Sequence, residues 1–225
     1  MEHHGNIKRF CFALDIESYN SLCVPKSTPT IGKSDRELLG IHQFEVYTNT
    51  FFAFLILDLD SNTSLSGFRK KITQQDGKIA KYCLIQILNG LTMDTPLEQI
   101  FGTPPLETNM VKPSDTYKRT VMTLELKANE ELLEAYKKVH EPGLVWPEII
   151  SNMKAIGVKD MEIYLYGYQA FLIMDTHLDF DMEKDGERWA NMPREKEWQA
   201  YVAKFQKIDP KSKTVEKWKT MILAE

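Results

Sequence analysis

An internal repeat constrains this chain more than any other feature of its sequence. Residues 40–58 read GIHQFEVYTNTFFAFLILD, and residues 157–175 read GVKDMEIYLYGYQAFLIMD. The two segments align without a gap at an offset of 117, and eight of their 19 positions are identical. A weaker pair, 8–16 and 118–126, aligns at an offset of 110. Because self-similarity at a fixed offset marks repeated structural units, we predict a tandem duplication.

The repeat divides the 225 residues into two modules, residues 1–110 and residues 116–225. The proline-rich stretch 104–114 between them has the composition of a linker. The predicted order within a module is strand, helix, strand, strand, helix and a final strand, which is close to the ferredoxin-like plan. The predicted fold is therefore α+β, with two tandem ferredoxin-like modules. We expect their antiparallel sheets to pack face to face as an intrachain α+β barrel, since each sheet otherwise exposes an apolar face.

The helices are clearest in the second module. Residues 129–140 predict a helix, with Asn129 as its N-cap and two glutamates in its first turn. A second helix is predicted from Trp146-Pro147 to about residue 155, because proline is tolerated in a first turn. A hairpin over 161–176 comes next, and a helical segment over 182–206 then breaks at Pro193.

The first module departs from this plan at its first helix. It is seven residues shorter there, and it carries Pro25, Pro29 and Gly32. Proline in a helix interior removes a hydrogen bond and clashes with the preceding turn. We therefore predict that the first module lacks this helix, that residues 20–38 form a loop or a short helical turn, and that no ligand pocket forms there.

Composition excludes several classes of protein and assigns no chemistry. The net charge of −4 gives no reason to expect a nucleic-acid partner. The longest apolar run, 51–57, is far shorter than the roughly 20 residues that cross a bilayer, and the first ten residues hold no apolar signal segment. Three cysteines (Cys11, Cys23 and Cys83) without metal-binding spacing favour reduced thiols. We expect a cytoplasmic protein without nucleic-acid or membrane partners.

One histidine and several aromatic residues could form a site in the second module. Tyr136 and His140 are four residues apart in the predicted helix, so they share a face, and Tyr164 lies on a strand that this helix would cover. All the tryptophans fall in this module: Trp146, Trp189, Trp198 and Trp218. We expect His140 to face a cleft between the helix and its sheet. The alternative is a hydrogen-bonded core histidine within an aromatic core.

Metal signals are weak. Asp58-Leu59-Asp60 and Asp179-Phe180-Asp181 have the spacing of a metal motif, but acidic residues at strand ends are more often solvated. His177 has no ligand partner at metal-binding spacing. We expect no metal and no cofactor.

The second module resembles the L-rhamnose mutarotase family, which includes L-fucose mutarotases of the second type. The resemblance covers nearly all of residues 118–225. It rests on Tyr136 to His140 (YKKVH), Val145 to Glu148 (VWPE), Gly157, Met161 to Leu165 (MEIYL), Phe171 to Met174 (FLIM), Trp198 and Trp218. The first module matches only at 8–16 and 45–58, without the YxxxH and WPE motifs. It departs from the family at its first helix.

The resemblance implies a ferredoxin-like module that usually pairs as a dimer. In this chain, the degenerate first copy would take the place of the second subunit. Self-association stays open. It also implies interconversion of the α and β anomers of a 6-deoxy-L-hexose without a cofactor. His140 and Tyr136 would donate and accept protons, with Tyr164 and Trp198 near the sugar. We add Trp146 and Trp189 as candidate substrate-binding residues.

Two departures concern which sugar is used. Met161 stands where rhamnose-type members often have tyrosine, and Trp198-Gln199 stands where they often have two tryptophans, so L-fucose and L-rhamnose both stay open. Two rival functions also remain. One is a non-catalytic sugar-binding or scaffold protein descended from a mutarotase. The other is a cofactor-free oxygenase or isomerase of the wider barrel group, which rests on fold analogy alone.

Overall fold

The chain forms two compact units in a computed structural model that describes residues 7–23, 31–74, 87, 96–103, 116–207 and 218–224. The first unit takes the described residues up to Leu97 together with those from Met221 onward. The second unit takes those from Glu98 to Thr220. Each unit contains one antiparallel sheet with helices, so the predicted α+β class is confirmed.

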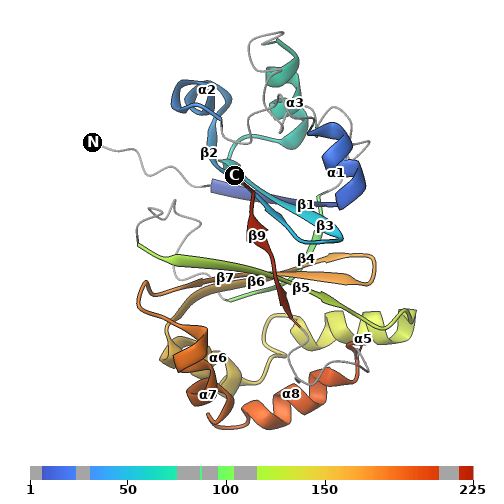
Figure 1. The fold of residues 1–225 in the computed structure, drawn as a ribbon, viewed down its shortest axis with the longest axis vertical. Helices are drawn as coiled ribbons and strands as arrows, with labels where there is room; N and C mark the ends of the chain where they lie inside the picture. Colours follow the sequence, from blue (N-terminus) through green and yellow to red (C-terminus); the bar gives the residue numbers. More distant parts are fainter. Residues whose placement is uncertain are drawn as a thin grey trace. The chain divides into compact units, whose positions relative to one another are not determined.

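The first unit has a four-stranded sheet in the order β1-β3-β2-β9. Its helices lie on one face of this sheet (Figure 1). Its elements in chain order are β1 (Ile7–Asp15), α1 (Ile16–Leu22), α2 (Lys33–Leu39), β2 (Ile41–Thr48), β3 (Phe52–Asp60), α3 (Leu65–Gln74) and β9 (Ile222–Leu223).

The second unit has a five-stranded sheet in the order β4-β6-β7-β5-β8, also with its helices on one face (Figure 1). The predicted break near Pro193 is confirmed, since it separates α7 from α8. Its elements are β4 (Glu98–Gly102), β5 (Lys118–Glu125), α5 (Glu130–His140), α6 (Pro147–Ile156), β6 (Val158–Tyr166), β7 (Gln169–Thr176), α7 (Met182–Ala190), α8 (Glu195–Ala203) and β8 (Lys219–Thr220).

The two repeated hairpins have the same register. β2 pairs with β3 through a bulge between Ile41 and Gln43, and β6 pairs with β7 through a bulge at the matching positions. Gly40 and Gly157 precede these strands with φ of 71° and 105°, values that glycine adopts without strain. The offset of 117 therefore describes the backbone as well as the sequence. The tandem duplication stays a prediction that this likeness supports.

A buried ion pair recurs at the same place in both sheets. Arg9 Nη2 lies 2.7 Å from Asp58 Oδ2, and Arg119 Nε lies 2.7 Å from Asp175 Oδ1. Asp58 is only 1% exposed, so the prediction that this acid is solvated is wrong. Its buried charge is stabilised by a paired guanidinium rather than by water.

Each sheet takes an edge strand from the other half of the sequence. β4 lies within residues 1–110 and pairs with β6 of the second unit, whereas β9 lies within residues 116–225 and pairs with β2 of the first. The compact units and the predicted modules therefore differ by these strands. The boundaries of the two sequence modules and the face-to-face barrel stay predictions.

The first unit keeps its first helix, contrary to prediction, in the shortened form α1. Asp15 caps it by accepting a hydrogen bond from the Ser18 backbone N–H at 2.8 Å. The described part of 20–38 contains only the end of α1 and the seven-residue α2, so it holds no regular three-turn helix. Cys23 is disulfide-bonded, whereas Cys11 is a buried cysteine outside any disulfide. The prediction of reduced thiols is therefore wrong for Cys23, and the cytoplasmic location inferred from them stays a prediction.

Candidate functional site

Helix α5 presents Tyr136 and His140 to the interior of the second unit. The helix begins where Asn129 accepts a hydrogen bond from the Leu132 backbone N–H at 2.9 Å, and acidic residues follow in the first turn. Because residues four apart in a helix are neighbours on one face, Tyr136 and His140 lie together. Tyr136 is 1% exposed and His140 is 6% exposed, so both side chains are nearly buried.

The ring of His140 is held by its own helix. Its Nδ1 lies 2.8 Å from the backbone carbonyl oxygen of Tyr136. Because a carbonyl oxygen only accepts, Nδ1 carries the proton, and the neutral ring has its lone pair at Nε2. Burial lowers the pKa of His140 to about 4, and the bond to the carbonyl opposes this shift only in part. The imidazole is therefore neutral at pH 7.

Aromatic rings surround the imidazole. Its centroid lies 4.4 Å from that of Tyr136, 5.9 Å from Trp198 and 6.1 Å from Phe101. Trp146 continues the run, with its ring 5.3 Å from Trp198. The structure thus brings together four of the predicted site residues, Tyr136, His140, Trp146 and Trp198.

Two polar atoms in this cluster have no protein partner. Within the described residues, neither the Tyr136 hydroxyl nor His140 Nε2 makes a hydrogen bond. Neither atom is among the fully buried side-chain nitrogens and oxygens without a hydrogen-bond partner in this part of the chain, which include Glu148 Oε2. The small exposed fractions of Tyr136 and His140 therefore include these two atoms. Burial raises the pKa of Tyr136, so its hydroxyl keeps its proton.

Tyr164 does not join this cluster. In β6, Met161 and Ile163 belong to the core that also contains the helix residues, and Tyr164 alternates with them. Its side chain therefore lies on the opposite face of the sheet, where its hydroxyl donates to Glu162 Oε2 at 2.7 Å. The register separates Tyr164 from His140, contrary to the expectation of one shared pocket. A role for Tyr164 in sugar binding stays a prediction.

Trp189 has its indole N–H engaged elsewhere. It donates to Glu195 Oε1 at 3.0 Å, and the side-chain amide of Asn152 donates to the same oxygen at 3.0 Å. Glu195 is 3% exposed, and burial raises its pKa against the effect of these two donors. This carboxyl joins α6, α7 and α8. Sequence reasoning missed it, because a glutamate in a first helical turn normally indicates only favourable helix-dipole interaction.

A charged group covers the outer part of the aromatic run. The Arg194 guanidinium carbon lies 4.0 Å from the centroid of the Trp146 ring. Its nitrogens donate to Glu148 Oε1 at 3.3 Å and to Glu197 Oε2 at 3.2 Å. Sequence reasoning treated Glu148 only as part of a motif and overlooked Arg194. Nothing in the sequence indicates the left-handed backbone that aims Arg194 at Trp146.

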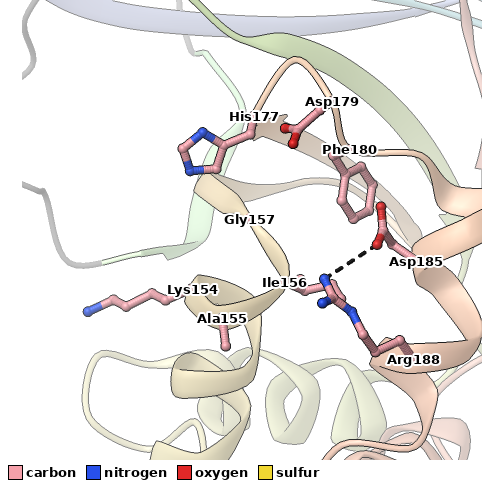
Figure 2. A pocket seen from close by; sticks show the side chains of 9 residues that line it. All are labelled: Lys154, Ala155, Ile156, Gly157, His177, Asp179, Phe180, Asp185 and Arg188. Carbon is pink, nitrogen blue, oxygen red and sulfur yellow. Dashed lines mark ion pairs between the residues drawn. The ribbon is translucent and has the colours of Figure 1, made fainter.

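A groove of about 340 Å³ lies elsewhere in the second unit, between the end of α6, the segment after β7, and α7 (Figure 2). Its charged side chains include an ion pair between Arg188 Nη2 and Asp185 Oδ1 at 3.3 Å. It contains neither Tyr136 nor His140, so it is not the predicted cleft. The groove is lined by Lys154, Ala155, Ile156, Gly157, His177, Asp179, Phe180, Asp185 and Arg188.

The described residues contain neither a cluster of metal-binding side chains nor a membrane-spanning helix. No group of three or more histidine, cysteine, aspartate or glutamate residues is placed to hold a metal ion in the parts of the chain that the structure describes. Among the same residues, no helix is both long and apolar enough to span a membrane.

Sequence comparisons with known proteins each match about half of the chain. The family model for L-rhamnose mutarotase matches residues 119–223. An L-fucose mutarotase of Xanthomonas campestris is 32% identical over 101 residues, which cover 45% of this chain and 81% of that protein. A UPF0734 protein of Dictyostelium discoideum is 35% identical over 111 residues, covering 48% of this chain and 87% of that protein.

One solved structure spans the whole chain at low similarity. It is that of an anthrone oxidase-like protein, with a TM-score of 0.40 and 10% sequence identity. The match covers 100% of this chain and 93% of the anthrone oxidase-like chain.

Proposed function

The chain belongs to the L-rhamnose mutarotase family, and from this premise we propose that its second repeat interconverts the α and β anomers of a 6-deoxy-L-hexose, either L-fucose or L-rhamnose. The proposal places the reaction at Tyr136 and His140, with Trp146 and Trp198 beside the sugar. The observation that carries it is the pair of polar atoms in this cluster, His140 Nε2 and the Tyr136 hydroxyl, that make no hydrogen bond within the described residues.

The two groups fit complementary halves of the reaction. Neutral Nε2 accepts the proton of the anomeric hydroxyl while the bond between C1 and the ring oxygen breaks. The Tyr136 hydroxyl, which holds its proton because burial raises its pKa, donates that proton to the ring oxygen. The open-chain aldehyde then rotates about C1–C2, and the same steps in reverse close the ring on the other face. On closure Tyr136 recovers its proton from the hydroxyl that becomes the ring oxygen, and His140 returns its proton to the oxygen on C1.

Proton transfer of this kind supplies enough help for such a reaction. General acid–base catalysis contributes roughly 10²- to 10⁴-fold, and anomer exchange already proceeds slowly in water. The apolar C–H and methyl surfaces of a 6-deoxy sugar suit the faces of Trp146 and Trp198. The sugar carries no charge for the protein to neutralise.

A non-catalytic sugar-binding or scaffold protein is the second candidate. The 6% exposure of His140 and its bond to a backbone carbonyl favour it, because a core histidine has the same features. The two candidates differ in whether the aromatic rings around His140 move apart so that a sugar reaches Nε2.

Saturation-transfer NMR of L-fucose and L-rhamnose separates these functions. We expect the protein to accelerate exchange between the α and β signals of at least one sugar. His140→Ala should reduce the accelerated rate by roughly 10²-fold or more with the fold retained, because a positioned proton acceptor is lost. His177→Ala, which removes an exposed histidine in the separate groove, is the matched control and should retain the full rate. A wild-type protein that accelerates neither sugar contradicts the mutarotase proposal.

A further inference from the structure

One carboxylate oxygen beside the aromatic run, Glu148 Oε2, is occluded and has no hydrogen-bond donor among the described residues, although the Glu148 side chain as a whole is 41% exposed. Glu148 Oε2 has no partner within the described residues, although Oε1 of the same group accepts from Arg194. The pKa of Glu148 is lowered first by its own backbone N–H and then by Arg194, so the group is a carboxylate at neutral pH. No donor in the described part of the chain meets hydrogen-bond geometry at Oε2. This oxygen is an unsatisfied acceptor on a partly exposed side chain, and it therefore favours an incoming donor.

The backbone that carries Arg194 is in an unfavourable conformation. Its φ of 63° makes it the one non-glycine residue with positive φ in the described chain. Such a conformation persists only where the surroundings over-determine it, and it occurs most often at functional sites. Here the conformation places the guanidinium over Trp146 and within reach of Glu148.

Arg194 and Glu148 are continuous with the candidate site. Trp146 lies under the guanidinium and contacts Trp198, whose ring in turn contacts His140. The run thus has a proton-accepting end at His140 and a charged end at Glu148. A sugar bound along it would meet different chemistry at its anomeric carbon and at its remaining hydroxyls.

We propose that Glu148 is a specificity-determining residue of this site, whose Oε2 accepts a hydrogen bond from a ring hydroxyl of the 6-deoxyhexose remote from the anomeric carbon. Arg194 is a positioning residue that holds the carboxylate in place through Oε1. The inference rests on the proposed function. L-fucose and L-rhamnose differ in the orientation of their hydroxyls at C2 and C4. A fixed acceptor at one position therefore accepts a hydroxyl of one sugar and misses that of the other.

The expected discrimination follows from the strength of such a bond. Hydrogen bonds to charged groups are stronger than neutral ones, and a site built to bond a hydroxyl rejects the analogue that cannot offer it. We expect wild-type kcat/KM to differ between L-fucose and L-rhamnose by about tenfold or more.

The test compares two glutamates that both bind Arg194. Saturation-transfer NMR gives kcat and KM of wild type, Glu148→Gln and Glu197→Gln for both sugars. Glu148→Gln should reduce the ratio of the two kcat/KM values by about tenfold, through KM of the preferred sugar, with kcat little changed. Glu197→Gln removes an exposed partner of Arg194 without affecting Oε2, and it should retain the wild-type ratio.

Arg194→Gly provides a second variant that keeps the turn, because glycine adopts positive φ without strain. It should lower the same ratio, although less than Glu148→Gln does. The inference is overturned if an active wild type treats both sugars alike, if Glu148→Gln leaves the ratio unchanged, or if Glu197→Gln lowers it equally. A wild type that accelerates neither sugar overturns the proposed function, and the inference with it.

Discussion

The two repeats share a hairpin and differ in the helix that follows their first strand. In the second repeat α5 runs from Glu130 to His140 and presents Tyr136 and His140 on one face. In the first repeat α1 runs only from Ile16 to Leu22, and its one buried residue is Tyr19. The hairpins keep register, bulge and ion pair because their strands form the core of each sheet. The repeats diverge in the helix outside that core, so we expect the proton-transfer chemistry in the second repeat alone.

The largest expected effect concerns what the repeats share. Arg119→Met should reduce the free energy of unfolding by about 3–5 kcal/mol, because Asp175, 2% exposed, is left buried without its guanidinium. Arg9→Met should do nearly the same in the first unit. Urea denaturation followed by circular dichroism measures both variants. Arg188→Met, at an exposed pair, should change stability by less than about 0.5 kcal/mol, and an equal loss there would contradict the reasoning.

The second effect is confined to the second repeat and depends on pH. His140 has a pKa of about 4 in the folded protein and an ordinary value of 6.5. As the pH falls below 6.5 the unfolded chain therefore takes up the proton first, and stability decreases until about pH 4. The loss should be about 3 kcal/mol, at roughly 1.4 kcal/mol per pKa unit.

Unfolding free energies between pH 4 and 7.5 test this pH dependence. His140→Phe, which keeps an aromatic ring, should remove this part of the slope, whereas His177→Ala should retain it. An unchanged slope in His140→Phe would show that the imidazole titrates normally and is not sequestered.

A matched pair of tyrosines compares the repeats directly. Tyr136→Phe should lower the accelerated anomer exchange by roughly 10- to 100-fold, less than His140→Ala, because it removes one proton donor and keeps the ring. Tyr19→Phe, at the buried tyrosine of α1, should leave the rate unchanged. The measurement is saturation-transfer NMR on the preferred sugar. Equal losses in both variants would mean that the first repeat takes part in the reaction.

The smallest effect concerns the buried carboxyl of Glu195. Its folded pKa is raised, so its contribution to stability is fully present at low pH and is lost as the pH rises through the folded pKa. Glu195→Gln keeps an acceptor for Trp189 and Asn152 and removes the charge. It should raise the free energy of unfolding at pH 7 and have little effect below pH 4. Glu187→Gln on exposed surface is the control, and a destabilised Glu195→Gln at pH 7 would contradict the prediction.

Sequence predicted what depends on local pattern. The offset of 117 gave the register of both hairpins, and the spacing of Tyr136 and His140 gave their common face because helix geometry fixes it. The cap at Asn129 and the break before α8 likewise follow from local chemistry. These elements account for most of the second repeat and for the centre of the candidate site.

What the sequence did not predict depends on tertiary packing. The side of the sheet on which Tyr164 lies is set by strand parity after the bulge near Val158, and hydrophobic residues on both faces of β6 hide that parity. The exchanged edge strands depend on pairings between distant segments. Glu195 and Arg194 acquire their roles only when α6, α7 and α8 meet.

The exchange of edge strands has a consequence for the order in which this chain folds. The partner of Tyr47 in β2 is Leu223, which is synthesised more than a hundred residues later. At roughly 5–20 residues per second, that end of β2 waits on the order of 10 s for β9. The entropic cost of closing a loop grows only slowly with its length, so the large sequence separation between β2 and β9 costs little stability. It leaves an unpaired strand edge on the nascent chain, open during that interval to pairing with a neighbouring chain.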